Sequence, residues 1–177
     1  MKTVRSIASF LFIVTRILAI AYLVTGIYVV GVLVFSDRSS GGTGWFRSLD
    51  DGSFRIMYPF TNSPFLLGDN TTSFLTMMVA IIFFYGSFMW LLSNVFGTFR
   101  KQKLFTPRGV TRLKGFYLLN LVVPVAAVLV VVFLYDEMLG DILMLTFLHV
   151  IIGIFAYFMA AIFRQGLLLQ EEQDLTL

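Results

Sequence analysis

Four long apolar segments that contain no aspartate or glutamate limit this chain to very few folds. They cover residues 7–35, 74–99, 116–135 and 142–163, and each offers the roughly 20 apolar residues that cross a bilayer as a helix. Hydrophobic residues make up 58% of the 177 residues and charged residues 13%, whereas a soluble domain has about 45–50% and about 25%. The sequence therefore predicts an all-α membrane protein, folded as a four-helix transmembrane bundle.

The lysines and arginines are distributed unevenly between the connections, and this bias predicts the orientation. Ten of the 13 lie before residue 17, in the connection 100–115 or at Arg164, whereas seven of the ten carboxylates lie in the other two connections. Basic residues are retained on the cytoplasmic side. We therefore expect both termini and the 100–115 connection in the cytoplasm and the loop 36–73 outside. On this view residues 1–177 form one membrane domain, with residues 164–177 as a cytoplasmic tail.

The long loop between the first two spans carries the pattern of a β-hairpin. Residues 45–49 and 54–60 flank Asp51-Gly52, a dipeptide typical of type I′ turns because both residues accept positive φ angles. Apolar and polar residues alternate in the second arm, so one face of the hairpin is apolar. The sequence predicts an extracytoplasmic hairpin on the mouth of the bundle, with strand pairing ended by Pro59 and Pro64.

A helix start lies within the 100–115 connection. Thr106 has the hydroxyl of an N-cap and Pro107 suits the first helical position, so the third helix is predicted to begin before its apolar span. Arg108 and Arg112 are four residues apart and share one helix face, which suits contact with lipid phosphates or with a partner. The alternative is that they simply follow the positive-inside bias. Pro124 is predicted to kink the same helix within the membrane.

The C-terminal tail combines one basic residue, a short apolar patch and an acidic end. Arg164 ends the fourth span, and the patch 166–169 is too short to cross a bilayer. The carboxylates that follow are Glu171, Glu172 and Asp174. Because the 100–115 connection is basic and lies on the same side, we expect the tail to fold back against it as a short amphipathic segment. The alternative is a tail that continues straight from the fourth helix into solvent.

Two short segments of the sequence resemble a bacterial protein family. They read KLFTPRGVTRLKGFYLL at residues 103–119 and FRQGLLLQEEQDLTL at residues 163–177. With four spans and a longer first outer loop, they resemble the DUF2975 family of four-helix inner-membrane proteins of unknown function. Gly109 departs from the family pattern, which usually has asparagine there. The resemblance implies the bacterial cytoplasmic (inner) membrane and, because many relatives are encoded beside a small helix-turn-helix regulator, a regulatory pairing. It implies no catalytic residues.

Arg16 and His149 are the two residues within the spans that stand out chemically. Arg16 either lies at the inner interface, since residues 17–35 alone nearly span the core, or is an intramembrane charge of the kind that is often functional. His149 is expected to hydrogen-bond a neighbouring helix, and the alternative is a proton-linked role or a contact with lipid or quinone. It is the only histidine and there is no cysteine, so bis-histidine haem, multi-histidine zinc and iron–sulfur sites are excluded. We expect no metal and no cofactor.

The sequence lacks the components of the common enzyme, carrier and DNA-binding classes. No carboxylate lies in a span to serve acid–base chemistry or proton coupling, and no phosphate-binding loop or HExxH motif occurs. The basic connection has no module that reads nucleic acid. We therefore expect no catalytic residue and no enzyme.

Two functions of different classes fit this chain. The first is a regulatory or accessory membrane protein. It would bind a membrane complex or a cytoplasmic helix-turn-helix regulator through the 100–115 connection and the tail, or through the bundle surface. The second is a small transport or lipid- or quinone-handling protein with a cavity near His149, Asn120 and Pro124. The candidate contact residues for lipid or partner are Arg16, Arg108, Arg112, His149, Arg164, Glu171, Glu172 and Asp174.

Overall fold

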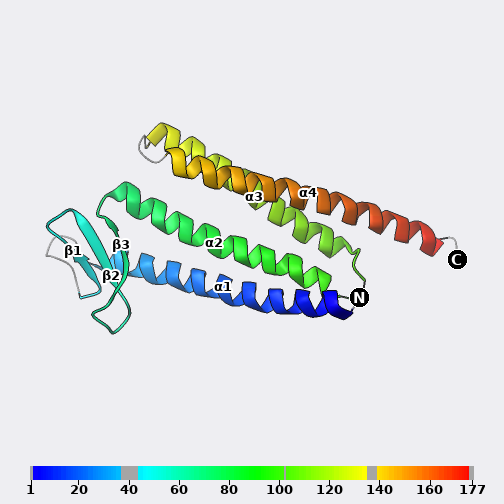
Figure 1. Ribbon diagram of the computed structural model, residues 1–177, viewed down its shortest axis with the longest axis horizontal. Coiled ribbons are helices and arrows are strands. Elements are labelled where there is room, and N and C mark those ends of the chain that lie inside the picture. The colour runs from blue at the N-terminus through cyan, green and yellow to red at the C-terminus, as the bar shows by residue number, and fades with distance from the viewer. Residues whose placement is uncertain (1, 37–43, 102, 135–138, 176–177) are drawn as a thin grey trace. The chain divides into compact units, whose positions relative to one another are not determined.

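The computed structural model describes residues 2–36, 44–101, 103–134 and 139–175, which form four helices and three strands. In chain order the elements are α1 Lys2–Phe35, β1 Phe46–Ser48, β2 Ser53–Met57, β3 Pro64–Asp69, α2 Thr72–Phe99, α3 Pro107–Leu134 and α4 Leu139–Leu175 (Figure 1). Each of the four helices has a stretch long and apolar enough to cross a membrane. The four predicted apolar helices of membrane-spanning length are therefore present.

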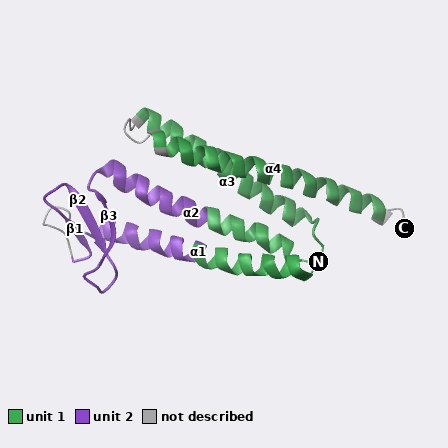
Figure 2. Ribbon diagram, in the orientation of Figure 1, with its two compact units in different colours: residues 1–18, 88–177 green, residues 19–87 purple. Residues whose placement is uncertain are grey.

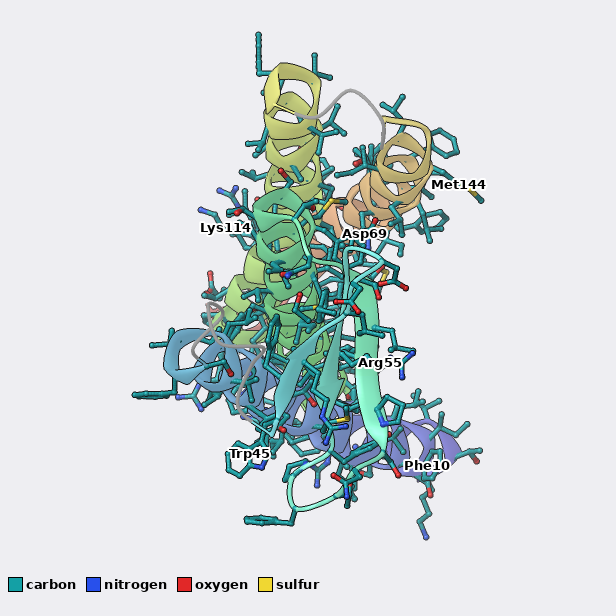
Figure 3. The ribbon with its side chains drawn as sticks, turned by 90° about the vertical axis from the view of Figure 1, so that its left-hand side faces the viewer. Phe10, Trp45, Arg55, Asp69, Lys114 and Met144 are labelled. Atoms are coloured by element: carbon teal, nitrogen blue, oxygen red, sulfur yellow. The ribbon has the colours of Figure 1, made fainter. Side chains whose placement is uncertain are left out.

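The outward faces of the helices carry large apolar side chains. Phe10 on α1 and Met144 on α4 extend away from the ribbon in Figure 3 and are 67% and 79% exposed. Soluble proteins rarely expose large contiguous apolar patches, because water solvates such surfaces poorly. Lipid chains are the solvent that suits these faces.

The starts of α2 and α3 are set by threonine caps. Thr106 Oγ1 accepts a hydrogen bond from the Gly109 backbone nitrogen at 3.1 Å, and Pro107 occupies the first helical position. Thr71 Oγ1 accepts one from the Phe74 nitrogen at 3.3 Å. The predicted start of the third helix is therefore confirmed.

The predicted hairpin is present, but its turn differs from the prediction. β1 and β2 pair antiparallel, with Phe46 opposite Ile56. The Leu49 nitrogen donates to the Ser53 carbonyl at 2.9 Å, so three residues form the loop, and Gly52 is the residue of this loop with a positive φ, of 79°. The two-residue type I′ turn was wrong, because it requires a positive φ at both central positions. A three-residue loop needs a left-handed residue only at its end, and the glycine supplies it.

A third strand extends the sheet beyond the hairpin. β3 pairs antiparallel with β2 to give the order β1-β2-β3, and Met57 lies opposite Pro64 after a register shift. β2 ends at Met57, shortly before Pro59, but the prediction that Pro64 ends the pairing was wrong because β3 begins there. Proline lacks an N–H group, yet the first residue of an edge strand tolerates it because that position can leave the donor out of the ladder.

Packing divides the described chain into two compact units, residues 1–18 with 88–177 and residues 19–87 (Figure 2). In the unit of residues 19–87, one face of the sheet packs on apolar residues of α1 and α2. The buried core residues are Val29, Val32, Phe46, Phe54, Ile56, Leu75 and Ile82. Tyr28 Oη donates to the Met57 carbonyl at 2.6 Å, and the Phe74 ring lies so close to Gly68 that no side chain fits there. The exposed side chain of Arg55 lies on the sheet's other surface (Figure 3).

In the other unit, α3 and α4 lie side by side (Figure 1). The core of this unit comprises Val95 of α2 with Leu113, Phe116, Ala156, Ala160 and Phe163 of α3 and α4. Gly153 is also buried, and a Cβ there would lie 2.8 Å from Leu121, so a glycine is what permits the close approach of these two helices. Small residues on one face of α4 thus form the helix contact.

The fourth helix does not stop at the end of its apolar span. α4 continues without a break from Leu139 to Leu175, so the tail does not fold back as a separate segment. That prediction was wrong. The residues after Arg164 include good helix formers such as leucine, glutamine and glutamate, and no proline or cap interrupts them.

Candidate functional site

Arg16 lies against α2, where it contacts a polar and an aromatic side chain. Its Nη2 donates a hydrogen bond to Asn94 Oδ1 at 2.8 Å. Its guanidinium carbon lies 3.8 Å from the centroid of the Trp90 ring and 5.2 Å from that of Phe12. A planar guanidinium stacks well on aromatic faces, so three contacts hold this cation in one orientation.

A second arginine reaches the same asparagine from α3. Arg112 Nη1 donates to the Asn94 backbone carbonyl at 3.3 Å. Gly97 lies beside this contact, and a Cβ there would be 3.3 Å from Arg112 Nη1. We call Arg16, Asn94 and Arg112, with the Trp90 ring, the arginine cluster.

A third arginine lies next to the cluster at the end of α2. Arg100 Nε donates to Ser9 Oγ at 3.2 Å, and its guanidinium carbon is 4.5 Å from the Phe12 ring centroid. The sequence has no aspartate or glutamate at residues 1–36 or 70–135, which include all of α1, α2 and α3. The positive charge of the cluster is therefore not balanced by any carboxylate on these helices.

The other basic candidates differ from Arg16 and Arg112. Arg108 and Arg164 are exposed, whereas Arg16 and Arg112 are half-buried. Sequence reasoning singled out both arginines of the cluster but missed the residues that join them. Trp90 and Asn94 are four residues apart on α2 and so share one helix face. An aromatic ring and an amide on the same face of an apolar helix could have indicated a binding partner for Arg16.

His149 and Asn120 form a buried polar pair between α4 and α3. His149 Nδ1 lies 2.8 Å from Asn120 Oδ1, and because a carbonyl oxygen only accepts, Nδ1 carries the proton. Asn120 Nδ2 in turn donates to the Phe116 carbonyl at 2.8 Å. The Phe88 ring meets the imidazole edge to face at 5.3 Å between centroids. The expected hydrogen bond from His149 to a neighbouring helix is thus present.

Pro124 adds a further contact to this region. It lies inside α3, and having no N–H it leaves the Asn120 carbonyl without the usual bond four residues on. Thr146 Oγ1 on α4 donates to the Pro124 carbonyl at 3.2 Å. Among the described residues, no buried side-chain nitrogen or oxygen lacks a hydrogen-bond partner. A pocket of about 200 Å³ in the chain is lined instead by Tyr28, Gly31, Val32, Phe35, Ser36 and Trp45.

The two segments that carry the family resemblance meet at the start of α3. The Phe105 ring packs edge to face on Phe163, with centroids 5.3 Å apart, and Phe163 also packs on Phe99 at 5.5 Å. A Cβ on Gly166 would lie 2.7 Å from the Phe105 ring, so the helix backbone itself contacts the α2–α3 connection. A Cβ on Gly109 would lie 2.7 Å from a Thr98 methyl group. Both glycines are therefore points of close packing.

Beyond this junction, α4 presents apolar and acidic side chains to its surroundings. Leu168 and Leu169 are 51% and 61% exposed, and Glu171 and Glu172 are exposed. The Asp174 side chain lies outside the described part of the structure. The tail meets the α2–α3 connection through Gly166 and the Phe105 ring, and not as the folded-back segment that was expected. No group of three or more histidine, cysteine, aspartate or glutamate side chains that could hold a metal ion occurs in the described part of the chain.

Comparisons with known proteins place the chain in a family. The profile described as a protein of unknown function, DUF2975, matches residues 51–177, which is more than two thirds of the chain. No curated protein and no solved structure matched it. The match includes strands β2 and β3, the last three helices and both segments that form the junction of α3 and α4. With these features in place, the chain belongs to the DUF2975 family.

Proposed function

We propose that this protein is a non-enzymatic regulatory or accessory protein of the bacterial cytoplasmic membrane. It binds a protein partner through the α2–α3 connection and the end of α4. The observation that carries this proposal is the unbroken continuation of α4 past Arg164 to Leu175. At 1.5 Å per residue this extension is about 16 Å long, which is enough for three turns outside the bilayer.

The orientation follows from the charge distribution. The basic residues of the α2–α3 connection lie between two apolar helices, and Arg164 follows the apolar segment 142–163 within α4, so the positive-inside rule applies to both. Both termini are then cytoplasmic. Reporter fusions after Lys103 and Leu177 are expected to report the cytoplasm, and one after Gly42 the outer side. A cytoplasmic signal from the Gly42 fusion would contradict this orientation.

The α4 extension has the chemistry of a helix that docks into a groove. Leu168 and Glu171 are three residues apart, and Leu168 and Glu172 four, so one face combines an apolar anchor with two carboxylates. The Phe105 ring on Gly166 fixes the base of the extension. A partner with a basic rim around an apolar groove is complementary to this face. A cytoplasmic regulator, of the kind implied by the family resemblance, is our preferred candidate.

Crosslinking from two positions on α4 tests this proposal. A photoreactive residue in place of Leu168 is expected to capture one soluble protein, whereas the same residue in place of Phe158, within the apolar span, captures lipid only. The Glu171→Lys/Glu172→Lys variant is expected to lose the captured protein because its charge is reversed. Asp69→Lys, on the exposed edge of the sheet, is the matched control and is expected to retain it. If the Glu171→Lys/Glu172→Lys variant still captures the protein, the acidic face of the α4 extension is not the binding surface.

The alternative function, transport or handling of lipid or quinone near His149, has less support. His149 and Asn120 are buried and bonded to each other, and the Phe88 ring covers the imidazole. Such a pair suits the packing of two helices better than the binding of a substrate.

A further inference from the structure

We propose that the arginine cluster binds the phosphate group of an acidic phospholipid. This inference concerns a different part of the chain from the α4 extension and does not depend on a protein partner. It rests on the depth of the cluster in the membrane, on its uncompensated charge and on the apolar surface around it.

The lengths of three helices place the cluster at the boundary of the hydrocarbon core. From Arg16 to the end of α1, from Asn94 back to the start of α2 and from Arg112 to the end of α3, the axial distances are about 28, 33 and 33 Å at 1.5 Å per residue. The hydrocarbon core is about 30 Å thick. Each helix therefore places its cluster residue about one core thickness from its other end, at the boundary of the hydrocarbon core, from which a long arginine side chain reaches toward the lipid phosphates.

The charge of the cluster calls for an anion from outside the chain. Arg16 and Arg112 each have five N–H donors, and within the described structure both make their hydrogen bonds to Asn94 alone. No carboxylate lies on α1, α2 or α3. Two guanidinium groups that converge on one point without a carboxylate are suited to a phosphate, which accepts paired N–H bonds. Basic pockets between transmembrane helices bind lipid head groups in this way.

The surroundings favour a lipid over a free phosphate ion. Trp90 is 42% exposed and holds the Arg16 guanidinium on its face, and aromatic rings of this kind are common at the head-group level. Ile13 and Ile17 flank Arg16 on α1 and are both exposed. A phosphate bound by Arg16 thus lies beside an apolar wall that suits the acyl chains of the same molecule.

Tryptophan fluorescence tests this proposal, because the chain has only Trp45 and Trp90. The full-length Trp45→Phe protein is reconstituted in phosphatidylcholine vesicles that contain either brominated phosphatidylglycerol or brominated phosphatidylcholine, and quenching of Trp90 is measured. Charge-assisted hydrogen bonds predict about a tenfold preference for phosphatidylglycerol. Equal quenching by the two lipids overturns the proposal without any further variant.

Matched arginine variants separate the site from general surface charge. The Arg16→Gln/Arg112→Gln variant in the Trp45→Phe background is expected to lose the preference for phosphatidylglycerol, so that the two brominated lipids quench Trp90 about equally. Arg108→Gln/Arg164→Gln removes the same charge from exposed positions and is expected to keep it. If the first double variant does not elute as a single species, Arg112→Gln alone is expected to reduce the preference about threefold. An equal reduction in the exposed pair overturns the proposal.

A competition arm distinguishes the two sources of phosphate. Excess inorganic phosphate is added to the phosphatidylglycerol vesicles at constant ionic strength. The lipid is expected to keep its preference, because its acyl chains hold it beside Arg16. Chloride at the same ionic strength is the control. If phosphate removes the preference for phosphatidylglycerol and chloride does not, the site binds a free ion and the lipid assignment is overturned.

Discussion

Asn120 and Asn94 are both amides in apolar helices, but they lie in contrasting surroundings. Asn120 is fully buried and bonds one histidine on the neighbouring helix. Asn94 is half-buried and bonds two arginines, one through its side chain and one through its backbone carbonyl. The first group of residues can be neutral as a whole, whereas the second carries two positive charges.

This difference shows where in the chain a ligand is to be sought. A neutral polar pair completes its own hydrogen bonds and so joins two helices without help from outside. A cationic cluster in or near hydrocarbon remains costly until an anion approaches it. The same residue type therefore serves packing at Asn120 and, on our proposal, ligand binding at Asn94.

The largest expected effect comes from breaking the buried pair. His149→Leu leaves Asn120 Oδ1 buried without a donor, and Asn120→Leu leaves His149 Nδ1 without an acceptor. Each single variant is expected to lower the free energy of unfolding by about 1–2 kcal/mol. The double variant removes both polar groups and is expected to lower it no further than either single variant. Unfolding in mixed detergent micelles measures these values.

Phe147→Leu, on the exposed face of α4, serves as the control for the pair and is expected to stay within about 0.5 kcal/mol of the natural chain. Additive losses in the double variant would show that the two side chains are not coupled, contrary to the 2.8 Å contact.

A glycine lies beside each of the two asparagines, and alanine substitutions there compare how tightly the two sites are packed. A Cβ at Gly153 would lie 2.8 Å from Leu121 and 3.3 Å from the Asn120 Cβ, so Gly153→Ala must shift or repack α3. We expect this to lower the free energy of unfolding by about 1–2 kcal/mol. A Cβ at Gly97 would meet only side-chain atoms of Arg112 and Phe12 at 3.3 Å. Alanine favours a helix over glycine by about 1 kcal/mol, so Gly97→Ala is expected to be neutral or stabilising. Thermal unfolding of both variants measures the contrast, and equal losses would contradict it.

The third effect depends on the lipid. Asn94→Leu removes the acceptor of the Arg16 bond and is expected to lower the free energy of unfolding by about 1 kcal/mol in phosphatidylcholine. With acidic lipid present we expect less than half of this loss, because a phosphate takes over the guanidinium donors. The loss in Asn120→Leu is expected to be the same in both lipids. A lipid-independent loss at Asn94 would remove the distinction between the two sites.

The sequence predicts those parts of the fold that depend on local pattern. The four spans follow from the length of apolar runs, the start of α3 from Thr106 and Pro107, and the first two strands from alternation around Asp51-Gly52. The third strand could not be predicted, because Pro64 argues against a strand and only its pairing with Met57 at the sheet edge makes it tolerable. The continuation of α4 past Arg164 was likewise missed, since charge complementarity suggested a turn that local helix propensity does not support.

The candidate sites divide in a similar way. Arg16 and His149 stand out in any apolar sequence because of their charge and hydrogen-bonding groups. Asn120 was placed near His149 only as the lining of a possible cavity, and Asn94 was not linked to Arg16 at all. Neither hydrogen bond could be predicted, because the partners lie 29 and 78 residues apart along the chain and are brought close only by packing. Phe105 and Gly166 were known only as parts of two separate motifs, and their contact is a product of the fold.

The smallest expected effect concerns a polar group exposed to water, which is stabilised without a buried partner and without a lipid. It serves as the reference for the two asparagine sites. In the exposed turn between β1 and β2, Asp51 Oδ1 accepts hydrogen bonds from Ser53 Oγ at 2.6 Å and from the Ser53 nitrogen at 2.9 Å, and these bonds lower the pKa of Asp51. Because the folded pKa lies below the unfolded one, this stabilisation is present above the unfolded pKa and is lost as the pH falls through the folded pKa. Ser53→Ala removes the stronger bond and is expected to raise the pKa of Asp51 toward the usual aspartate value, as measured by the carboxyl carbon shift in an NMR titration. Ser48→Ala on β1 is the control and should leave that titration unchanged, whereas an unshifted titration in Ser53→Ala would mean that the turn is not held by this hydroxyl.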